Sequence, residues 1–195
     1  MRPCIGDCLQ RVLNRCAALV DSFSIAIELP RLEVLNAMSM AMRYRGPDDE
    51  GIYRAGHIGL VHRRLSIRDL SAAGHCPMGS EDGQVQVVFN GEIYNWRELR
   101  QELEARGVGF TSQSDTEVVL HGYRVWGHEL LPRLRGMFAF AIWDGKLRRL
   151  LLARDRAGEK PLFYQRSPEG LILWLEFWFR LVAGKKQSAL IGFQA

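Results

Sequence analysis

The sequence predicts an α+β domain in which helices pack on antiparallel β-sheet. Three observations support this fold class: apolar runs of strand length, two helical segments in the middle of the chain, and hairpin patterns in its last third. The strands and helices do not alternate along the chain as they do in βαβ units. Runs of strands followed by runs of helices are typical of helices that cover an antiparallel sheet.

Two apolar runs precede the helical segments. Residues 58–62 (IGLVH) and 85–89 (VQVVF) have the length and the β-branched content of strands, and a loop rich in Gly, Pro and Ser separates them. The second run passes directly into Asn90-Gly91-Glu92. Asn-Gly commonly forms a two-residue hairpin, but here no second strand follows at once. We therefore expect Asn90-Gly91 to lie at the open end of a strand.

The first helix is expected over residues 95–107. Asn95 can act as its N-cap, and Glu98 three residues later would complete a capping box. Gly107 is expected to end the helix, because glycine readily adopts the conformation of a helix C-terminal cap. The apolar face of this helix consists of Trp96, Leu99 and Leu103.

The second helix is expected over residues 114–127, with the same kind of signals. Ser114 and Glu117 have the spacing of a second capping box, and Gly127 closes the segment. Its apolar face consists of Val119, Tyr123 and Trp126.

Two hairpins are expected after the helices. Residues 137–155 form two strand-like runs around Asp144-Gly145, which is a strong hairpin signal. Residues 160–166 and 171–177 form the second pair, joined by the turn sequence Ser-Pro-Glu-Gly.

Composition narrows the functional classes. The chain has 195 residues, of which 47% are hydrophobic and 25% charged, as is usual for a globular protein with a packed core. The net charge of +4 comes from scattered arginines, so we expect no nucleic-acid partner. The apolar run 171–183 is too short to span a membrane and contains Glu176 and Arg180, so we expect no membrane association.

The four cysteines argue for a reducing compartment. They are too few for a disulfide framework, and three of them lie in the first sixteen residues. Cys4 and Cys8 lack a second Cys or His pair at zinc spacing, so no metal site is expected. Acidic residues interrupt the N-terminal segment, which therefore makes a poor signal peptide. These features predict a cytoplasmic protein.

Seven motifs carry a family resemblance. In order along the chain they are RYRGPDDEG (43–51), HRRLSIRDLS (62–71), AGHCPM (73–78), FNGEIYN (89–95), SDTEV (114–118), RLRGMFAFAIWD (133–144) and RDRAGEKPLFY (154–164). Together they resemble the glutaminase domain of glutamine-hydrolysing asparagine synthetases, which are class II, N-terminal-nucleophile glutamine amidotransferases. The resemblance covers about residues 32–175 and implies a four-layer αββα sandwich of antiparallel sheets, truncated at the C-terminus.

The resemblance implies a site for L-glutamine. Arg64 would bind the substrate carboxylate, which a guanidinium can grip bidentately. Asp115 would pair with the α-ammonium, helped by Glu92. Asn90 and the Gly91 N–H would hold the oxyanion of the tetrahedral intermediate. Taken singly, each residue also has an ordinary interpretation: a surface cation, a helix first-turn acid, a solvated charge or a turn.

The resemblance also implies a cysteine nucleophile whose own α-amine acts as the base. This chain opens Met1-Arg2-Pro3-Cys4 instead of with a cysteine after the initiator methionine. Cys16 stands 29 residues before Arg45, close to the family spacing, and residues 16–24 can align with a first strand. Residues 1–15 would then be an extension or a propeptide. The alternative is that Cys16 is an internal, inert thiol.

The implied domain organisation is a glutamine amidotransferase domain over residues 16–175, followed by an atypical tail over residues 176–195. No Ser-Gly-Gly-x-Asp-Ser pyrophosphatase loop occurs, so we expect no cofactor in this chain; ATP and Mg²⁺ belong to the missing synthetase domain. Such a chain would hydrolyse glutamine to glutamate and ammonia for asparagine biosynthesis, with a separate synthetase chain as a possible partner. The alternative is a non-catalytic glutamine-binding or interaction domain, a gene remnant without an N-terminal nucleophile.

Overall fold

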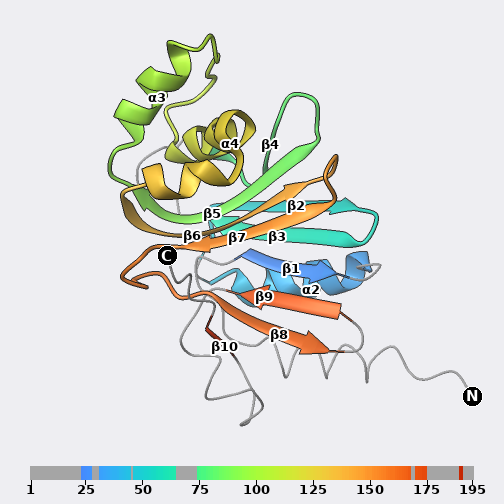
Figure 1. The fold of residues 1–195 in the computed structure, drawn as a ribbon. Helices are drawn as coiled ribbons and strands as arrows, with labels where there is room; N and C mark the ends of the chain where they lie inside the picture. Colours follow the sequence, from blue (N-terminus) through green and yellow to red (C-terminus); the bar gives the residue numbers. More distant parts are fainter. Residues whose placement is uncertain are drawn as a thin grey trace, which may run out of the picture. The chain divides into compact units, whose positions relative to one another are not determined.

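The computed structural model (Figure 1) describes residues 23–27, 31–44, 46–64, 74–167, 170–174 and 189–190. Its internal contacts divide the chain into two compact units. The first unit comprises Met1–Leu65 with Pro161–Ile191, and the second comprises Ser66–Lys160 with Gly192–Ala195. Each unit has its own antiparallel sheet, and the two are described separately below.

The first unit contains a six-stranded sheet with the order β10-β8-β9-β1-β3-β2. Its strands are β1 (Phe23–Ile27), β2 (Asp49–Ala55), β3 (Ile58–Arg64), β8 (Phe163–Ser167), β9 (Gly170–Trp174) and β10 (Ala189–Leu190). All neighbouring strands run antiparallel. Helix α2 (Leu32–Met42) packs on β3 and β2 through its buried residues Leu35, Met38 and Met42.

The second unit contains a four-stranded sheet with the order β4-β5-β6-β7. Its strands are β4 (Met78–Gly79), β5 (Val85–Ile93), β6 (Gly136–Asp144) and β7 (Arg149–Arg154). Two helices, α3 (Trp96–Glu104) and α4 (Asp115–Trp126), and the 3-10 helix η2 (Gly127–Arg133) complete it. Helix α4 contacts the sheet at β5, and α3 and η2 pack on α4 (Figure 1).

The core of the second unit lies between α4 and one face of its sheet. Because strand side chains alternate between faces, Val87 and Phe89 of β5 share this face with their β6 partners Phe140 and Ile142. The rings of Phe89 and Phe140 are stacked, with centroids 6.4 Å apart. Helix α4 contributes the apolar face predicted for it, together with the predicted face of α3. These contributions are Leu99 and Leu103 of α3 and Val119 and Tyr123 of α4, with Trp96 and Trp126 partly buried beside them.

The positions of both predicted helices are confirmed, but neither capping box forms. The Asn95 side chain bonds the main chain of Arg133 and Arg135 and makes no cap bond to its own helix. The Ser114 side chain does cap α4, by accepting the Thr116 N–H at 3.1 Å. Glu117 does not complete the box and turns back to the loop before the helix.

The expectation that Asn90-Gly91 lies at the open end of a strand is wrong. Strand β5 continues through both residues to Ile93, paired in register with β6. The pairing of β5 with β6 continues because each strand has a glycine where the two main chains approach closely. Gly91 has φ of +139°, and a Cβ there would lie 2.1 Å from the Met137 carbonyl oxygen. The partner strand opens with Gly136, where a Cβ would lie 2.0 Å from the Glu92 oxygen.

Both predicted hairpins are confirmed. The β6–β7 pair nearest the connection is Asp144 with Arg149, so four residues (145–148) join the two strands. The connection is therefore longer than a two-residue turn. The Asp144 carboxylate organises this connection by accepting the Leu147 N–H at 2.8 Å. Strands β8 and β9 pair up to Ser167 opposite Gly170. Strand β2 and helix α2 were not anticipated from the sequence.

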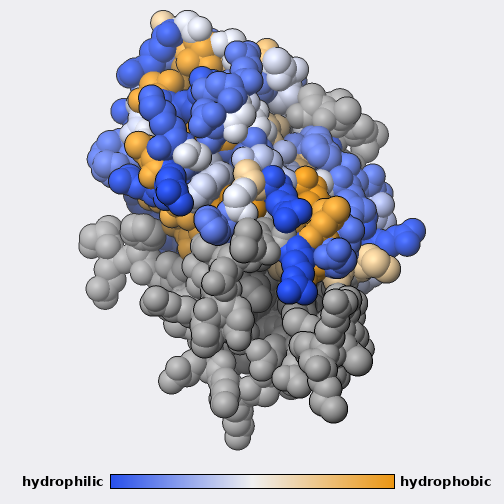
Figure 2. Space-filling view, turned by 90° about the vertical axis from the view of Figure 1, so that its right-hand side faces the viewer, coloured by the Kyte–Doolittle hydropathy of each residue, from blue (hydrophilic) through white to orange (hydrophobic). Residues whose placement is uncertain are grey.

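The predicted first strand is described only in part. Strand β1 begins at Phe23, so it contains the last two residues of the predicted segment 16–24, and Cys16 lies outside the described residues. Within the described ranges, no helix is long and apolar enough to cross a membrane. On the face shown in Figure 2, hydrophilic residues cover most of the described surface, with apolar residues between them.

Candidate functional site

The edge of β5 between Asn90 and Ile93 carries most of the predicted site. Phe138, which stands opposite Gly91, directs its N–H and its carbonyl away from β5, toward Asp155. The Gly91–Phe138 pair is therefore of the non-hydrogen-bonded kind, so the Gly91 N–H points to the outer edge of β5. The Ile93 N–H, two residues further on, points to the same edge. Strand β4 pairs with β5 only at Gln86 and Val87 and does not cover this part.

Asp115 lies beside this edge. It is the first residue of α4, and its Oδ2 accepts the Ile93 N–H at 2.9 Å. Burial raises the pKa of the Asp115 carboxyl, the bond from Ile93 opposes this, and the charge of nearby Glu92 raises the pKa further. Two carboxylates thus lie near each other at this end of β5, an arrangement that a bound cation would stabilise.

The side chains of Asn90 and Glu92 lie on the face of the sheet opposite the core. They alternate with Phe89 and Ile93, which face α4, and they share their face with β6 partners Ala139 and Met137. An amide side chain and a carboxylate side chain therefore flank the Gly91 backbone. This places a neutral hydrogen-bond donor, a main-chain N–H and a negative charge within three consecutive residues.

Arg64, the predicted carboxylate-binding residue, is the last residue of β3 in the first unit. The segment before β2 lies against this end of β3, because the Asp48 N–H donates to the Arg64 carbonyl at 3.1 Å. Gly46 packs so closely there that a Cβ would lie 2.5 Å from the Arg64 nitrogen. Only glycine allows this approach, which holds the end of β3 in place.

The structure thus brings together four of the six predicted site residues: Asn90, Gly91, Glu92 and Asp115. Arg64 belongs to the other unit, and Cys16 lies outside the described residues. In the described part of the chain, no group of three or more His, Cys, Asp or Glu residues could hold a metal ion.

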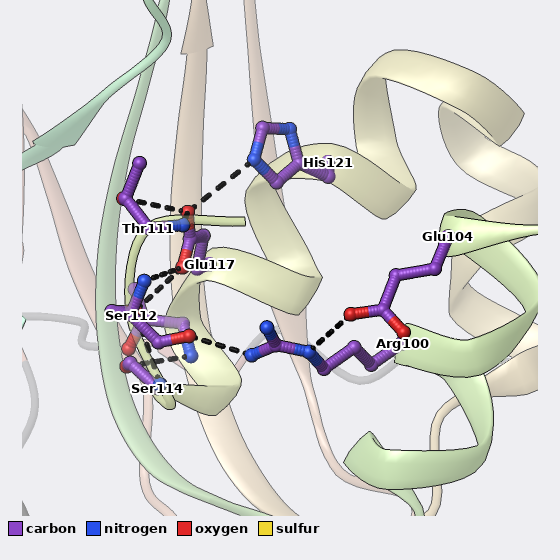
Figure 3. A network of polar contacts seen from close by, with 8 residues as sticks. Arg100, Glu104, Thr111, Ser112, Ser114, Glu117 and His121 are labelled. Atoms are coloured by element: carbon purple, nitrogen blue, oxygen red, sulfur yellow. Dashed lines mark hydrogen bonds and ion pairs between the residues drawn. The ribbon is translucent and has the colours of Figure 1, made fainter. Parts of the chain in front are cut away.

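Sequence reasoning missed the role of Glu117 at this site. Glu117 is 4% exposed, and its carboxylate accepts hydrogen bonds from Thr111 and Ser112 in the loop before α4 (Figure 3). Its position three residues after Ser114 predicts a capping box instead. The polar run Thr-Ser-Gln-Ser before the helix was the available signal, because its hydroxyls and N–H groups need acceptors.

Comparisons with known proteins show which family the chain resembles. The family model described as a glutamine amidotransferase domain matches residues 20–178. Asparagine synthetase [glutamine-hydrolyzing] 1 of Bacillus subtilis (strain 168) is 47% identical over 132 residues, which are 68% of this chain and 21% of that protein. A putative asparagine synthetase [glutamine-hydrolyzing] of Mycobacterium tuberculosis (strain H37Rv) is 47% identical over 142 residues, covering 68% and 22%. The chain thus spans 21–22% of the length of these two relatives.

Solved structures show the same fold at lower identity. Glutamine phosphoribosylpyrophosphate amidotransferase from B. subtilis, complexed with ADP and GMP, has a TM-score of 0.58 and 20% sequence identity, covering 94% of this chain and 40% of its own. This likeness, with the helices and antiparallel sheets described above, confirms the predicted α+β fold class. With a family model that matches most of its length, the chain belongs to the glutamine amidotransferase domain family.

Proposed function

We propose that this domain binds L-glutamine and hydrolyses it to glutamate and ammonia. The proposal rests on one structural observation above the family membership: Asp115 is bonded to the strand edge that carries Asn90, Gly91 and Glu92. Glutamine is a zwitterion with a side-chain amide, so its site needs an anion, a cation and donors for an oxyanion. The second unit supplies the anion, which is Asp115, and the oxyanion donors, which are Asn90 and Gly91.

Each residue has a role in this proposal. The carboxylate of Asp115, with Glu92 beside it, would hold the α-ammonium of glutamine. The Asn90 side-chain amide and the Gly91 N–H would donate to the oxygen of the scissile amide as it gains negative charge, which is worth about 10²–10³ in rate for each donor. Arg64 would bind the α-carboxylate, and this role is supported by its motif alone.

Cys16 is the proposed nucleophile. Removal of residues 1–15 would expose its α-amine, which has a pKa near 7.7–8.0 and can accept the thiol proton at neutral pH. The sulfur would attack the amide carbon, ammonia would leave with that proton, and water would hydrolyse the γ-glutamyl thioester to glutamate and free thiol. Each step balances without a metal or a redox partner.

The fate of the ammonia is proposed from the similarity to asparagine synthetases. It would serve asparagine synthesis on a separate synthetase chain, which would supply its own ATP and Mg²⁺. We also propose that the reaction takes place in the cytoplasm, as the cysteine usage indicates.

A second candidate function is glutamine binding without turnover. It is the function expected of a chain in which Cys16 stays internal, because its nitrogen is then a peptide nitrogen that cannot accept the thiol proton. Among the described residues the only cysteine is Cys76, which is 3% exposed. It lies in the middle of the chain and therefore has no free α-amine to act as a base. A chain that keeps Met1 would retain the ammonium-binding group and lack a nucleophile with a free α-amine.

Covalent labelling distinguishes the two functions. The purified chain is treated with a diazo-ketone analogue of glutamine, and the labelled peptide and the N-terminal residue are identified by mass spectrometry. Label on Cys16 at a new N-terminus, lost in a Cys16→Ser variant and kept in Cys76→Ser, is expected for the hydrolase. An unlabelled chain that retains Met1 and binds glutamine would support binding alone. An unlabelled chain that does not bind glutamine would contradict both functions.

A further inference from the structure

Glu117 is the acceptor for a set of donors in the loop before α4 (Figure 3). Its Oε1 accepts the Thr111 N–H at 2.8 Å and the Thr111 hydroxyl at 2.9 Å. Its Oε2 accepts the Ser112 N–H at 2.7 Å and the Ser112 hydroxyl at 2.6 Å. Burial alone would raise the pKa of Glu117, but these hydrogen bonds outweigh burial and lower it. The carboxylate is therefore charged and bonded to the loop, and its Oε1 also lies 3.6 Å from Nε2 of His121 on α4 (Figure 3).

The hydrogen bonds continue from this carboxylate to the start of the helix. The Ser112 hydroxyl, which donates to Glu117, accepts the Ser114 N–H at 3.1 Å. The Ser114 hydroxyl in turn accepts the Thr116 N–H at 3.1 Å. Asp115 lies between the last two residues of this series. The path of the main chain into Asp115 is thus determined by hydrogen bonds that begin at Glu117.

Helix α3 supports the same loop from outside. Arg100 donates to the Ser112 carbonyl at 2.6 Å and is paired with Glu104 at 2.8 Å (Figure 3). The Arg100 guanidinium also lies over the Phe110 ring, 4.4 Å from its centroid. Glu117 holds the loop from the helix side and Arg100 holds it from the α3 side. The loop is therefore clamped at Ser112, three residues before Asp115.

This arrangement differs from ordinary helix capping. In a capping box the Glu side chain bonds the N–H of the N-cap residue, which here is Ser114. That N–H is already bonded to Ser112, and Glu117 reaches five and six residues back along the chain. The contacts therefore do more than complete the first turn of α4. They fix the direction from which the chain enters the helix, and with it the position of the Asp115 carboxylate.

We propose that Glu117 is a positioning residue that holds the Asp115 carboxylate at the open edge of β5. The Asp115 carboxylate, held there, selects ligands that carry an α-ammonium group. This inference rests on the proposed binding of glutamine. Asp115 would contact the ligand, and Glu117 would act only through Asp115. Loosening the loop would shift the carboxylate away from the Ile93 N–H and from the ammonium, while the contacts to the rest of the ligand would remain.

Binding of two ligands tests this role. Isothermal titration calorimetry compares L-glutamine with glutaramate, which is the same molecule without its α-amino group. Glu117→Gln keeps the shape of the side chain. Its NH₂ group, however, would face the N–H of Thr111 or Ser112, and two donors cannot form a hydrogen bond with each other. We expect it to weaken glutamine binding about tenfold, the scale of one charge-assisted hydrogen bond, and to leave glutaramate binding within about twofold. In an Asp115→Asn background, Glu117→Gln is expected to cost nothing further.

Tyr123→Phe is the matched control. It removes a buried hydrogen bond from the same helix, the one from the Tyr123 hydroxyl to Asp144 at 3.1 Å, but it does not touch the loop before Asp115. Both ligands should bind this variant as they bind the wild type. Ser112→Ala is a milder second variant that removes one hydroxyl between Glu117 and Ser114. It is expected to lower glutamine affinity selectively, by about threefold, without unfolding the chain.

The outcomes separate this inference from the proposed function. A wild-type chain that does not bind glutamine would overturn both. If the wild type binds glutamine, the inference alone is overturned by either of two results. The first is that Glu117→Gln and Ser112→Ala weaken both ligands equally or not at all. The second is that the effect of Glu117→Gln adds in full to that of Asp115→Asn.

Discussion

Asp115 and Ile93 are joined by a hydrogen bond of 2.9 Å from the Ile93 N–H to Oδ2 of Asp115, which connects the first residue of α4 to the last residue of β5. The bond satisfies a strand-edge donor that neither β4 nor β6 reaches. It also brings a carboxylate next to Glu92 although burial opposes its ionisation. A half-buried carboxylate beside a second one is a costly arrangement, and such sites are commonly functional.

Replacing Asp115 with Asn should separate binding from folding. The Asn side chain keeps an acceptor for the Ile93 N–H and removes the charge that burial opposes. We therefore expect the melting temperature to stay the same or rise. Glutamine affinity should fall about tenfold or more, because a charge-assisted hydrogen bond to the ammonium is lost. Thermal unfolding and calorimetric titration of the same preparations measure the two effects.

Asp82→Asn provides the control for this experiment. Asp82 is exposed and accepts hydrogen bonds from Ser80 and Gln84 in the turn before β5. The substitution therefore removes a negative charge, as Asp115→Asn does, without changing the candidate site. Its glutamine affinity should match that of the wild type. Equal loss of affinity in Asp82→Asn and Asp115→Asn would contradict the placement of the ammonium at Asp115.

The raised pKa of Asp115 predicts how glutamine binding depends on pH. Its pKa in the folded chain lies above the ordinary value of 3.8, so protonation begins at a higher pH than for an exposed Asp. The protonated carboxyl cannot pair with an ammonium, and affinity should fall as pH decreases through this pKa. The folded state binds this proton more tightly than the unfolded state does. Its contribution to stability is therefore present at low pH and lost as pH rises through the raised pKa.

Titrations of glutamine binding over a range of pH values measure this dependence. In the wild type, the loss of affinity below the Asp115 pKa should approach about tenfold per pH unit, since one proton competes with the ligand. Asp115→Asn should show no such loss over the same range. A wild-type profile as flat as that of the variant would mean that Asp115 does not contact the ligand.

Periodicity and turn chemistry predicted the parts of the fold that depend on neighbours in sequence. The apolar face of α4 at Val119 and Tyr123 follows from helical spacing, and the β6–β7 hairpin follows from Asp144-Gly145. The capping box at Asn95 failed because distant partners compete for the side chain. Asn95 bonds residues 38 and 40 positions away, which no local pattern contains.

The candidate site was accessible from sequence only through the family resemblance. Asp115 lies 22 residues from its partner Ile93, and no spacing rule relates them. Strand β5 continues past Asn90-Gly91 because β6, more than forty residues later, brings Gly136 to the crossing. Helix α2 was missed because its N-cap, Arg31, makes no side-chain cap bond and carries no start signal.

Gly91→Ala tests the close approach of β5 and β6. The added Cβ would meet the Met137 carbonyl oxygen at 2.1 Å, and φ of +139° is unfavourable for alanine. Strain of the main chain and overpacking together should lower the free energy of unfolding by roughly 2–4 kcal/mol. Urea denaturation followed by circular dichroism measures the change. Gly109→Ala, where no atom lies within 4 Å of the new Cβ, is the control and should change stability little.

Asp155→Ala should destabilise the end of β7. The Asp155 carboxylate, 4% exposed, accepts N–H groups of Phe138, Glu159 and Lys160. Without it the buried Phe138 N–H and two partly buried N–H groups lose their acceptor, which should cost about 2–4 kcal/mol. Burial alone would raise the pKa of Asp155, but the N–H donors outweigh burial and lower it.

The lowered pKa of Asp155 sets the pH dependence of this loss. The stabilising contribution is present above the ordinary value of 3.8 and disappears as pH falls through the lower folded-state pKa. The difference in urea midpoint between wild type and Asp155→Ala should therefore shrink from about pH 7 to about pH 3. A difference that stays constant over this range would mean that the charge of Asp155 does not contribute.

Arg63 and Glu50 should respond unequally to substitution, because only one of the two is buried. The Arg63 side chain is 9% exposed and that of Glu50 is 43% exposed, with 2.6 Å between Nη2 of Arg63 and Oε2 of Glu50. Arg63 also donates to the hydroxyl and the carbonyl of Ser39 on α2, so it links that helix to the end of β3. Glu50→Ala leaves a buried guanidinium without its carboxylate and should cost about 2–4 kcal/mol.

Arg63→Met should cost less, about 1–2 kcal/mol, because water can solvate the half-exposed Glu50 and the Met side chain fills the apolar part of the space. In the double variant, Glu50→Ala should add almost nothing to Arg63→Met, since no buried charge is left unpaired. Urea denaturation of the four proteins completes the cycle. Equal costs for the two single variants, or additive costs in the double variant, would mean that Arg63 is held by Ser39 alone.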